Sequence, residues 1–308
     1  MATRELQHDE DGALGHLGPA AAVAAVVAWG TGPVIAKHVA VEGLVLGWYR
    51  LSLGAVAAGL VLVATGRRLT RADLRTAVPG GIAFGLDMVL FFTAVKHTTV
   101  ANATIISALQ PALMLLVVGP LFGERVARRS VVLTAVALAG VIAVVLASSG
   151  TTEWSPGGDA LAVAALVAWM GYFVAAKQAR RTVGVLSYLV AIQLIGAAFV
   201  TPLALLSGRH FAVASGDWAW IAVMVAVPGG AGHLLMNWAH RYTAMQLSSA
   251  LTLGMPVVST LAAAVFLDEP LLVGQVVGMA VVVAALGALV WRASEPGAAR
   301  ATQRARIR

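Results

Sequence analysis

The sequence contains no cysteine and few charges. Without cysteine the chain can form no disulfide, hold no metal through thiolates and use no cysteine nucleophile. Only 11% of its 308 residues are charged, whereas 59% are hydrophobic and the mean hydropathy is +0.86. A soluble fold of this length cannot keep so much apolar surface away from water. The composition therefore predicts an integral membrane protein.

Motifs of several other protein classes are also missing. The chain has no glycine-rich phosphate loop, no paired-aspartate metal motif and no plausible grouping of serine, histidine and acid. We therefore expect neither an ATP-driven pump nor an enzyme, and no cofactor or metal. The net charge of +7 comes from basic residues between apolar runs, where they meet lipid head groups. Nucleic-acid binding is accordingly not expected.

Ten apolar runs have the length that crosses a hydrocarbon core at about 1.5 Å per residue. They fall near residues 17–36, 44–65, 76–95, 98–120, 130–148, 159–176, 183–206, 218–239, 243–266 and 271–290. The first sixteen residues are acidic, unlike the start of a signal peptide, so the first run is expected to remain as a membrane anchor. The sequence thus predicts an all-α membrane protein with ten transmembrane helices.

The distribution of basic residues predicts the orientation. If the N-terminus is cytoplasmic, seventeen of the 21 cations lie in inner segments and only Lys37, Lys96 and Arg209 in outer ones, while Arg50 lies within a span. This excess of basic residues predicts that both termini are cytoplasmic. The protein is expected in the plasma membrane. Residues 1–16 are then a cytoplasmic tail. Residues 291–308 form a basic cytoplasmic tail that is expected to lie against anionic lipid.

The chain also repeats itself. A shift of 145 residues places Thr98 on Thr243, Pro111 on Pro256 and Glu124 on Glu269. A shift of 140 places Trp29 on Trp169. We infer two homologous halves, 17–148 and 159–290. Because each half has five spans, an odd number, the two repeats must be inverted in the membrane, an architecture that recurs in secondary transporters.

These residues give the chain a family resemblance. Trp29-Gly30, Arg50, the run from Thr98 through Pro111 to Gly123-Glu124, and its second copy, Thr243, Pro256 and Asp268-Glu269, resemble the EamA group of the drug/metabolite transporter superfamily. The resemblance covers about residues 17 to 290. It implies ten helices, cytoplasmic termini and export of amino acids or other metabolites. Asp268 replaces the usual glycine, and no arginine in the second half matches Arg50, so the halves are chemically unequal.

Three ionisable residues within the spans are candidate site residues. Arg50 lies about six residues, on the order of 9 Å, below the outer end of its helix, where it either faces a cavity for a carboxylate or phosphate, or snorkels outward or pairs with Asp87. Asp87 would carry a proton or bind an amine. His233 lies one position from the repeat equivalent of Asp87. The two form either a proton relay or simple hydrogen bonds between helices.

Prolines and polar residues complete the predicted pathway. Pro111 and Pro256 free the carbonyls of Ser107 and Thr252, so their helices either border the pathway and flex or carry a static kink. Further polar and aromatic residues line a cavity or join helices. The predicted pathway residues are Trp29, Arg50, Asp87, Asn102, Ser107, Gln110, Trp169, Tyr172, Gln193, His233, Asn237 and Thr252.

Two further pairs are given structural interpretations. Glu124 and Glu269 precede helices whose N-terminal ends favour a carboxylate. Gly274 and Gly278 would bring the last helix against a second copy in a homodimer.

The overall function is predicted as alternating-access transport of a small, amphipathic solute such as an amino acid. The alternatives are a membrane-embedded enzyme acting on lipid, and a channel or lipid scramblase.

Overall fold

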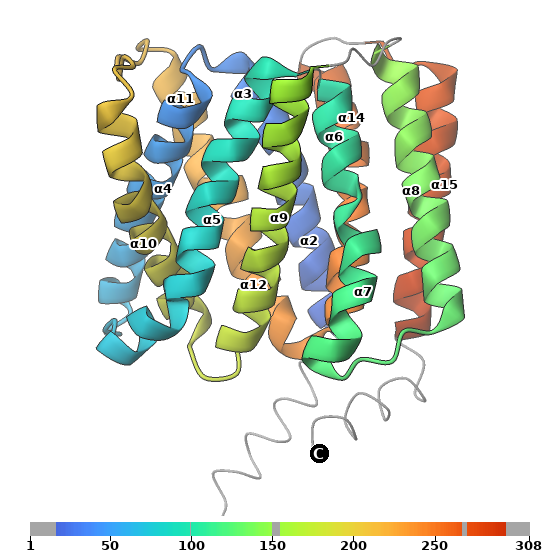
Figure 1. Cartoon of the computed structure of the whole chain (residues 1–308), viewed down its shortest axis with the longest axis horizontal. Helices are drawn as coiled ribbons and strands as arrows, with labels where there is room; N and C mark the ends of the chain where they lie inside the picture. The colour runs from blue at the N-terminus through green and yellow to red at the C-terminus, as the bar shows by residue number, and fades with distance from the viewer. Residues whose placement is uncertain (1–16, 99, 150–154, 267–269, 294–308) are drawn as a thin grey trace, which may run out of the picture.

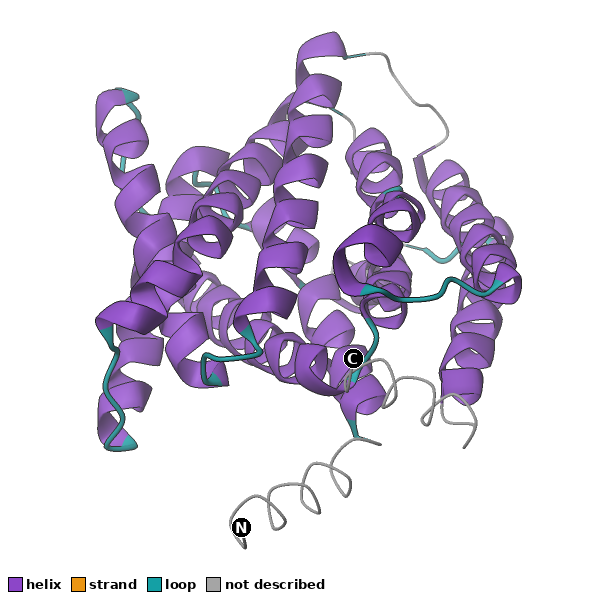
Figure 2. Cartoon of the chain, turned by 60° about the horizontal axis from the view of Figure 1, so that its bottom comes forward, coloured by secondary structure: helices purple, strands orange, loops and turns teal. Residues whose placement is uncertain are grey.

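Helices make up every regular element that the structure describes (Figure 2). The computed structural model describes residues 17–98, 100–149, 155–266 and 270–293. Ten helices in these ranges are long and apolar enough to cross a bilayer, which confirms the predicted fold class. The predicted tail 1–16, residues 294–308 of the predicted tail 291–308, and Asp268 and Glu269 lie outside the described residues.

The element order follows the ten predicted spans. The first half contains α2 (Gly18–Gly30) with α3 (Gly32–His38), α4 (Gly43–Ala64), α5 (Arg71–His97), α6 (Val100–Ala108) with α7 (Gln110–Phe122), and α8 (Arg128–Ser149). The second half contains α9 (Pro156–Ala179), α10 (Val185–Leu206), α11 (Asp217–Met224), η1 (Val225–Gly232) and α12 (His233–Tyr242), α13 (Met245–Leu251), η2 (Thr252–Gly254) and α14 (Met255–Phe266), and α15 (Val273–Ala293). Predicted and observed span ends differ by at most five residues.

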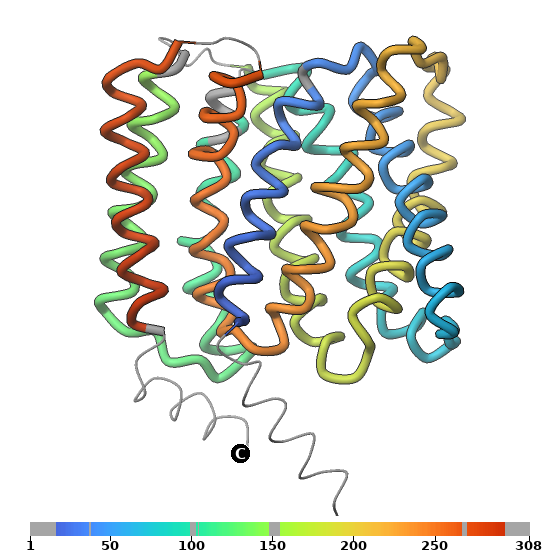
Figure 3. Tube along the Cα trace, turned by 180° about the vertical axis from the view of Figure 1, so that it is seen from behind, coloured from blue at the N-terminus to red at the C-terminus, as the bar shows by residue number. Residues whose placement is uncertain are grey.

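The two halves run through the bundle in opposite directions. The helix α2 begins, and α15 ends, on one face of the bundle, which we call the terminal face; the other is the opposite face (Figure 3). With five spans in each half, α2 starts at the terminal face and its repeat equivalent α9 starts at the opposite face. The repeats are therefore inverted.

Packing between the halves follows the same symmetry. The helix α9 packs on α5, and its repeat equivalent α2 packs on α12, while α4 packs on α10 and α8 on α15. Figure 1 shows α8 and α15 together at one edge of the bundle, with α4, α10 and α11 at the other edge. Such reciprocal pairs are what a two-fold axis between two similar halves generates.

The crossing of α8 and α15 lies on this local axis. A Cβ added at Gly140 would lie 2.8 Å from Val282 Cγ2 and 3.0 Å from the carbonyl oxygen of Gly278. One added at Gly278 would lie 2.8 Å from Val144 Cγ2 and 2.8 Å from the carbonyl oxygen of Gly140. A shift of 138 residues exchanges the two sets of contacts. The glycines therefore allow the last helices of the two halves to touch backbone to backbone.

This crossing changes the interpretation of the glycine pair in the last helix. Gly278 faces Gly140, and a Cβ at Gly274 would lie 2.9 Å from the Cβ of Ala147, also in α8. Both glycines are thus used within the chain and offer no face to a second copy. The basis on which a homodimer was predicted is removed.

Glu124 joins the two halves at the terminal face. Its Oε1 accepts a hydrogen bond from the amide of Met245 at 2.7 Å, and its Oε2 accepts one from the amide of Gln246 at 3.1 Å. The carboxylate therefore caps the start of α13, in the second half. The sequence had predicted that it caps the next helix along the chain. An anionic side chain satisfies amides that a helix start leaves without partners.

Candidate functional site

A cavity of about 680 Å³ lies between the halves. Its lining extends to Val95 and Leu272, close to the opposite face, and its deep end includes Arg50, Asp87 and His233. All lining residues lie in the middle of the bundle or toward the opposite face. The cavity therefore opens toward the opposite face, and its volume suits a small molecule.

Arg50 is held at the deep end of this cavity by three neighbours. Its side chain is only 5% exposed, although it carries a charge within a span. One guanidinium nitrogen lies 2.9 Å from His233 Nε2, a second donates to the sulfur of Met88, and the guanidinium carbon lies 5.5 Å from the centre of the Phe84 ring. Hydrogen bonds and a ring face partly replace the water that the buried cation loses.

The bond from Arg50 fixes the proton on His233. Because arginine has donors and no acceptor, His233 Nε2 must accept, and the neutral ring carries its proton on Nδ1. That nitrogen lies 3.0 Å from the hydroxyl of Tyr172, to which it donates. The amide nitrogen of Asn237 donates to the same hydroxyl at 3.1 Å. A buried polar chain thus runs from Arg50 through His233 and Tyr172 to Asn237.

Asp87 shares the cavity with Arg50, whose charge acts on it, but it has no hydrogen-bond partner among the described residues. Its carboxylate is 5% exposed, and no hydrogen bond or ion pair reaches it there. Arg50 bonds to His233 instead, so the predicted alternative of an Arg50–Asp87 ion pair is not what the structure contains. The cavity therefore presents a cation and an unpaired carboxylate together, within walls that are otherwise mostly apolar.

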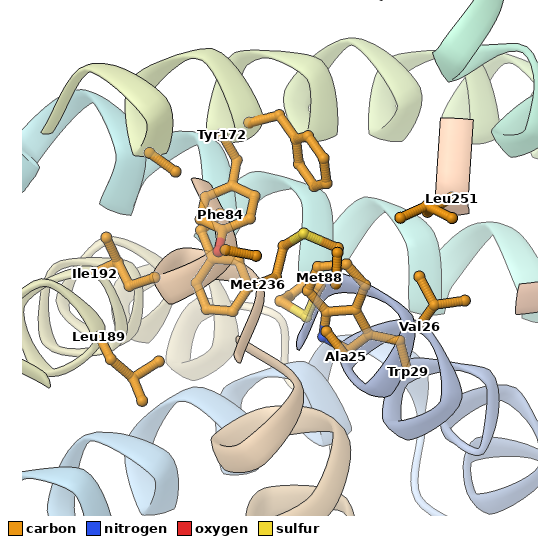
Figure 4. Packing of buried hydrophobic residues seen from close by; sticks show 14 of the residues in the cluster. Ala25, Val26, Trp29, Phe84, Met88, Tyr172, Leu189, Ile192, Met236 and Leu251 are labelled. Carbon is orange, nitrogen blue, oxygen red and sulfur yellow. The ribbon is translucent and has the colours of Figure 1, made fainter. Parts of the chain in front are cut away.

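Aromatic rings form one wall of the cavity. Trp29 and Trp169, which occupy equivalent positions in the two repeats, meet edge to face with ring centres 5.1 Å apart. The ring centre of His233 lies 4.8 Å from that of Trp29; outside the cavity lining, the ring centre of Phe84 lies 5.1 Å from that of Tyr172. Figure 4 shows Trp29, Phe84 and Tyr172 with Met88 and Met236 beside them. Such a wall suits the flat or apolar part of an amphipathic solute.

Interrupted helices position these groups. In the eighth span, residues 225–232 form a π-helix containing Pro228, and His233 follows immediately. A Cβ added at Gly229 would lie 2.9 Å from the carbonyl oxygen of Met224 and 3.8 Å from Arg50 Nε. Only glycine therefore leaves room for the backbone and for Arg50 here. Short π-helical segments are frequent at functional sites. This π-helix was not predicted from the sequence, although Pro228-Gly229-Gly230 in the middle of a span was its signal.

Both predicted proline breaks coincide with interruptions. The helix α6 ends at Ala108 and α7 begins at Gln110, next to Pro111; likewise, η2 separates α13 from α14 before Pro256. Where these spans approach each other, Gln110 Oε1 accepts hydrogen bonds from Ser249 Oγ at 3.0 Å and Thr252 Oγ1 at 3.2 Å. This polar contact joins the halves below the cavity.

The predicted residues whose side chains the structure describes lie in three places. Those that line the cavity are Trp29, Arg50, Asp87, Ser107, Trp169, His233, Thr252 and Pro256. Tyr172, Asn237 and Gln110 lie beneath it and join its floor by hydrogen bonds. Gln193 lies elsewhere: its Nε2 donates to the carbonyl of Gly54 at 3.2 Å, so it links α10 to α4 and is corrected to a contact between helices. The side chain of Asn102 is outside the described residues.

Several cavity residues were not predicted. Phe84 and Met88 contact Arg50, and Phe91 and Phe92 line the cavity nearer the opposite face. Phe84 and Phe91 share a helical face with Asp87, at spacings of three and four residues, which was the available signal. They are apolar, and sequence alone does not separate them from ordinary lipid-facing or core residues.

Removing the hydroxyl of Tyr172 tests the buried polar chain. Tyr172→Phe leaves His233 Nδ1 and the Asn237 amide without their shared acceptor, so we expect the initial transport rate to fall about tenfold, as for loss of ~1–2 kcal/mol of buried hydrogen bonding. Tyr188→Phe is the matched control, because the buried hydroxyl of Tyr188 has no partner among the described residues. Equal effects of the two changes would contradict the role given to the chain.

Comparisons with known proteins agree with this architecture. The model of a family described as the EamA-like transporter family matches residues 16–146 and 156–291. An uncharacterized transporter of Archaeoglobus fulgidus is 25% identical over 275 residues, which cover 89% of this chain and 96% of that protein. A protein crystal structure is similar with a TM-score of 0.79 and 21% identity, covering 90% of this chain and 99% of that one. That structural likeness concerns the fold.

Proposed function

The chain belongs to the EamA-like transporter family, and on that premise we propose that it exports a small amphipathic metabolite, such as an amino acid, by alternating access. The observation that carries the proposal is that Arg50 and the carboxylate of Asp87 both line one cavity, without a hydrogen bond between them. A cation and an anion so placed would receive the carboxylate and the amine of a zwitterion. The aromatic wall would hold its apolar part.

The asymmetry of the bundle supports alternating access. The cavity opens toward the opposite face, while the contacts of Gln110 and Glu124 close the bundle below it. Inverted repeats can exchange these two arrangements, so that the cavity opens to one side at a time. The excess of basic residues on the terminal face supports placing that face in the cytoplasm of a cell with this protein in its plasma membrane. The structure then corresponds to an outward-facing state.

Metabolite profiling tests the proposal. Liposomes containing the purified protein are loaded with a mixed metabolite pool, and retained compounds are measured by mass spectrometry against protein-free liposomes. We expect one chemical class to empty through the native protein, with saturation, and to be retained with the double variant Arg50→Ala, Asp87→Asn.

Other outcomes would replace the proposal. Equal, non-saturating loss through the native and variant proteins would indicate a channel, and loss of lipid asymmetry a scramblase. Retention of every metabolite, with a lipid chemically altered, would indicate an enzyme.

A further inference from the structure

Two cations turn inward where α9 ends at the terminal face. Lys177 lies in the last turn of α9 and is half-buried, and Arg180 follows that helix and is only 6% exposed. The neighbouring Arg181 is exposed, as cations at the end of a span usually are. Orientation in the membrane explains Arg181, but it does not explain why Lys177 and Arg180 turn inward.

Both donate to backbone carbonyls at the end of α12. Lys177 Nζ donates to the carbonyl of His240 at 2.7 Å and also to that of Thr243. Arg180 Nε donates to the carbonyl of Asn237 at 3.0 Å, and a second nitrogen donates to the carbonyl of Val183. We call the contacts of Lys177 and Arg180 with these three α12-end carbonyls the α12 clamp. The C-terminal end of a helix carries partial negative charge, so it serves here as an anionic ligand.

Polar atoms around the α12 clamp are left without partners. Neither ring nitrogen of His240, which is 1% exposed, has one among the described residues, nor do Asn237 Oδ1 and Thr243 Oγ1. No carboxylate in the described part of the chain pairs with Arg180. Buried polar atoms without partners are costly and rare, so their gathering beside two cations indicates a site that is satisfied in another arrangement.

Arg180 remains a cation at neutral pH. The pKa of Arg180 is lowered to about 10, mainly by burial and to a smaller extent by repulsion from the nearby guanidinium of Arg241. A charge that persists while its only ligands are neutral carbonyls would be better satisfied by an anion.

The α12 clamp is continuous with the cavity above it. Asn237 donates through its side chain to Tyr172, whose hydroxyl is bonded to His233 and so to Arg50, and it accepts from Arg180 through its carbonyl. The helix α12 therefore connects the floor of the cavity to Lys177 and Arg180. If the end of α12 moves away from α9, both cations and the unpartnered atoms become exposed together beneath the cavity.

We propose that Lys177, Arg180 and His240 form a second binding site, for a carboxylate or phosphate, which the solute reaches from the terminal face. In the present arrangement the α12-end carbonyls fill this site. The anionic group of an arriving solute competes with those carbonyls for the cations and so favours release of α12. The inference rests on the proposed transport function, because it gives the terminal face an open state.

The absence of cysteine makes a direct test available. Thr243→Cys introduces a single thiol at a buried position of the α12 clamp, and its rate of reaction with a soluble maleimide reports opening. The protein is studied in nanodiscs of phosphatidylcholine, a neutral lipid, where both faces are accessible. The probes are sodium acetate and inorganic phosphate, with sodium chloride at equal ionic strength as reference.

We expect acetate or phosphate to raise the labelling rate about fivefold, with saturation, by shifting the population toward the open form. Added to Thr243→Cys, either Arg180→Gln or Lys177→Gln should label fast without anion and respond no further. Arg181→Gln, the adjacent control, should behave like the native background. The gel-filtration profile identifies a variant that has not folded, and having two clamp variants keeps the test decisive.

Three results would overturn the site. The first is an equal effect of acetate, phosphate and chloride; the second is an unchanged anion response in both clamp variants. The third is fast labelling that phosphatidylglycerol in the nanodisc produces without acetate, which would assign the site to a lipid head group. Because labelling requires no transport, an Arg180-dependent response without Arg50-dependent metabolite loss would retain this site and reject the proposed function. Metabolite loss without the labelling response would retain the proposed function and reject this site.

Discussion

Replacing Arg50 by glutamine is expected to slow transport of the solute by on the order of a hundredfold. The change leaves His233 Nε2 without a donor and the Asp87 carboxylate alone in the cavity, with no cation to receive the solute's carboxylate. Removing one partner from a buried charged contact costs ~3–5 kcal/mol, and a loss of about 3 kcal/mol corresponds to a hundredfold in rate. The measurement is the initial rate of loss of the identified metabolite from loaded liposomes.

Two further variants serve as controls for this result. Arg50→Lys keeps the charge but cannot repeat the separate contacts of the guanidinium with His233 and Met88, so we expect about a tenfold loss. Arg209→Gln removes a cation that pairs with Glu42 at the surface, both of them exposed, and should change the rate less than about twofold. Native rates for a folded Arg50→Gln protein would remove Arg50 from the pathway.

Replacing Gly278 by leucine is expected to lower the apparent unfolding temperature by roughly 5 °C or more, as overpacking by about 1–3 kcal/mol would do. A Cβ at this position would lie 2.8 Å from the carbonyl oxygen of Gly140 and 2.9 Å from the amide nitrogen of Val144. Backbone atoms cannot rotate aside, so α8 and α15 must separate. Thermal unfolding of the purified protein in detergent, followed by tryptophan fluorescence, measures the change.

Gly287→Leu is the matched control on the same helix. No atom lies within 4 Å of a Cβ added at Gly287, so the added side chain meets open space, and we expect the unfolding temperature to stay the same. If both leucines lowered the temperature equally, the loss would reflect glycine itself and not the crossing with α8.

The fold followed from properties that act along the whole chain. Apolar length locates a span, and an odd number of spans in each repeat inverts the second one, so neither inference depended on how any side chain points. The depth of Arg50, Asp87 and His233 was predictable in the same way. Their rotation about the helix axes was not, because apolar residues surround each span on every side and leave no hydrophobic period to orient it.

That difference explains which site predictions need correction. Gln193 and Tyr172 are both polar groups at depth, yet Gln193 bonds to Gly54 between two helices whereas Tyr172 bonds to His233 beneath the cavity. The π-helix before His233 adds a further change of rotation that regular helical spacing does not predict. Glu124 was recognised as a helix cap, but the identity of the capped helix depends on tertiary packing.

A two-fold operation leaves every point on its axis in place, and the crossing of Gly140 with Gly278 is such a point. If each half takes up the conformation of the other during transport, the α8–α15 crossing maps onto itself while pairs away from it exchange distances. The distance between spin labels attached near the crossing, on the lipid-facing sides of the two helices, should therefore stay constant during transport. It would be an internal reference for every other spectroscopic distance measured in the protein.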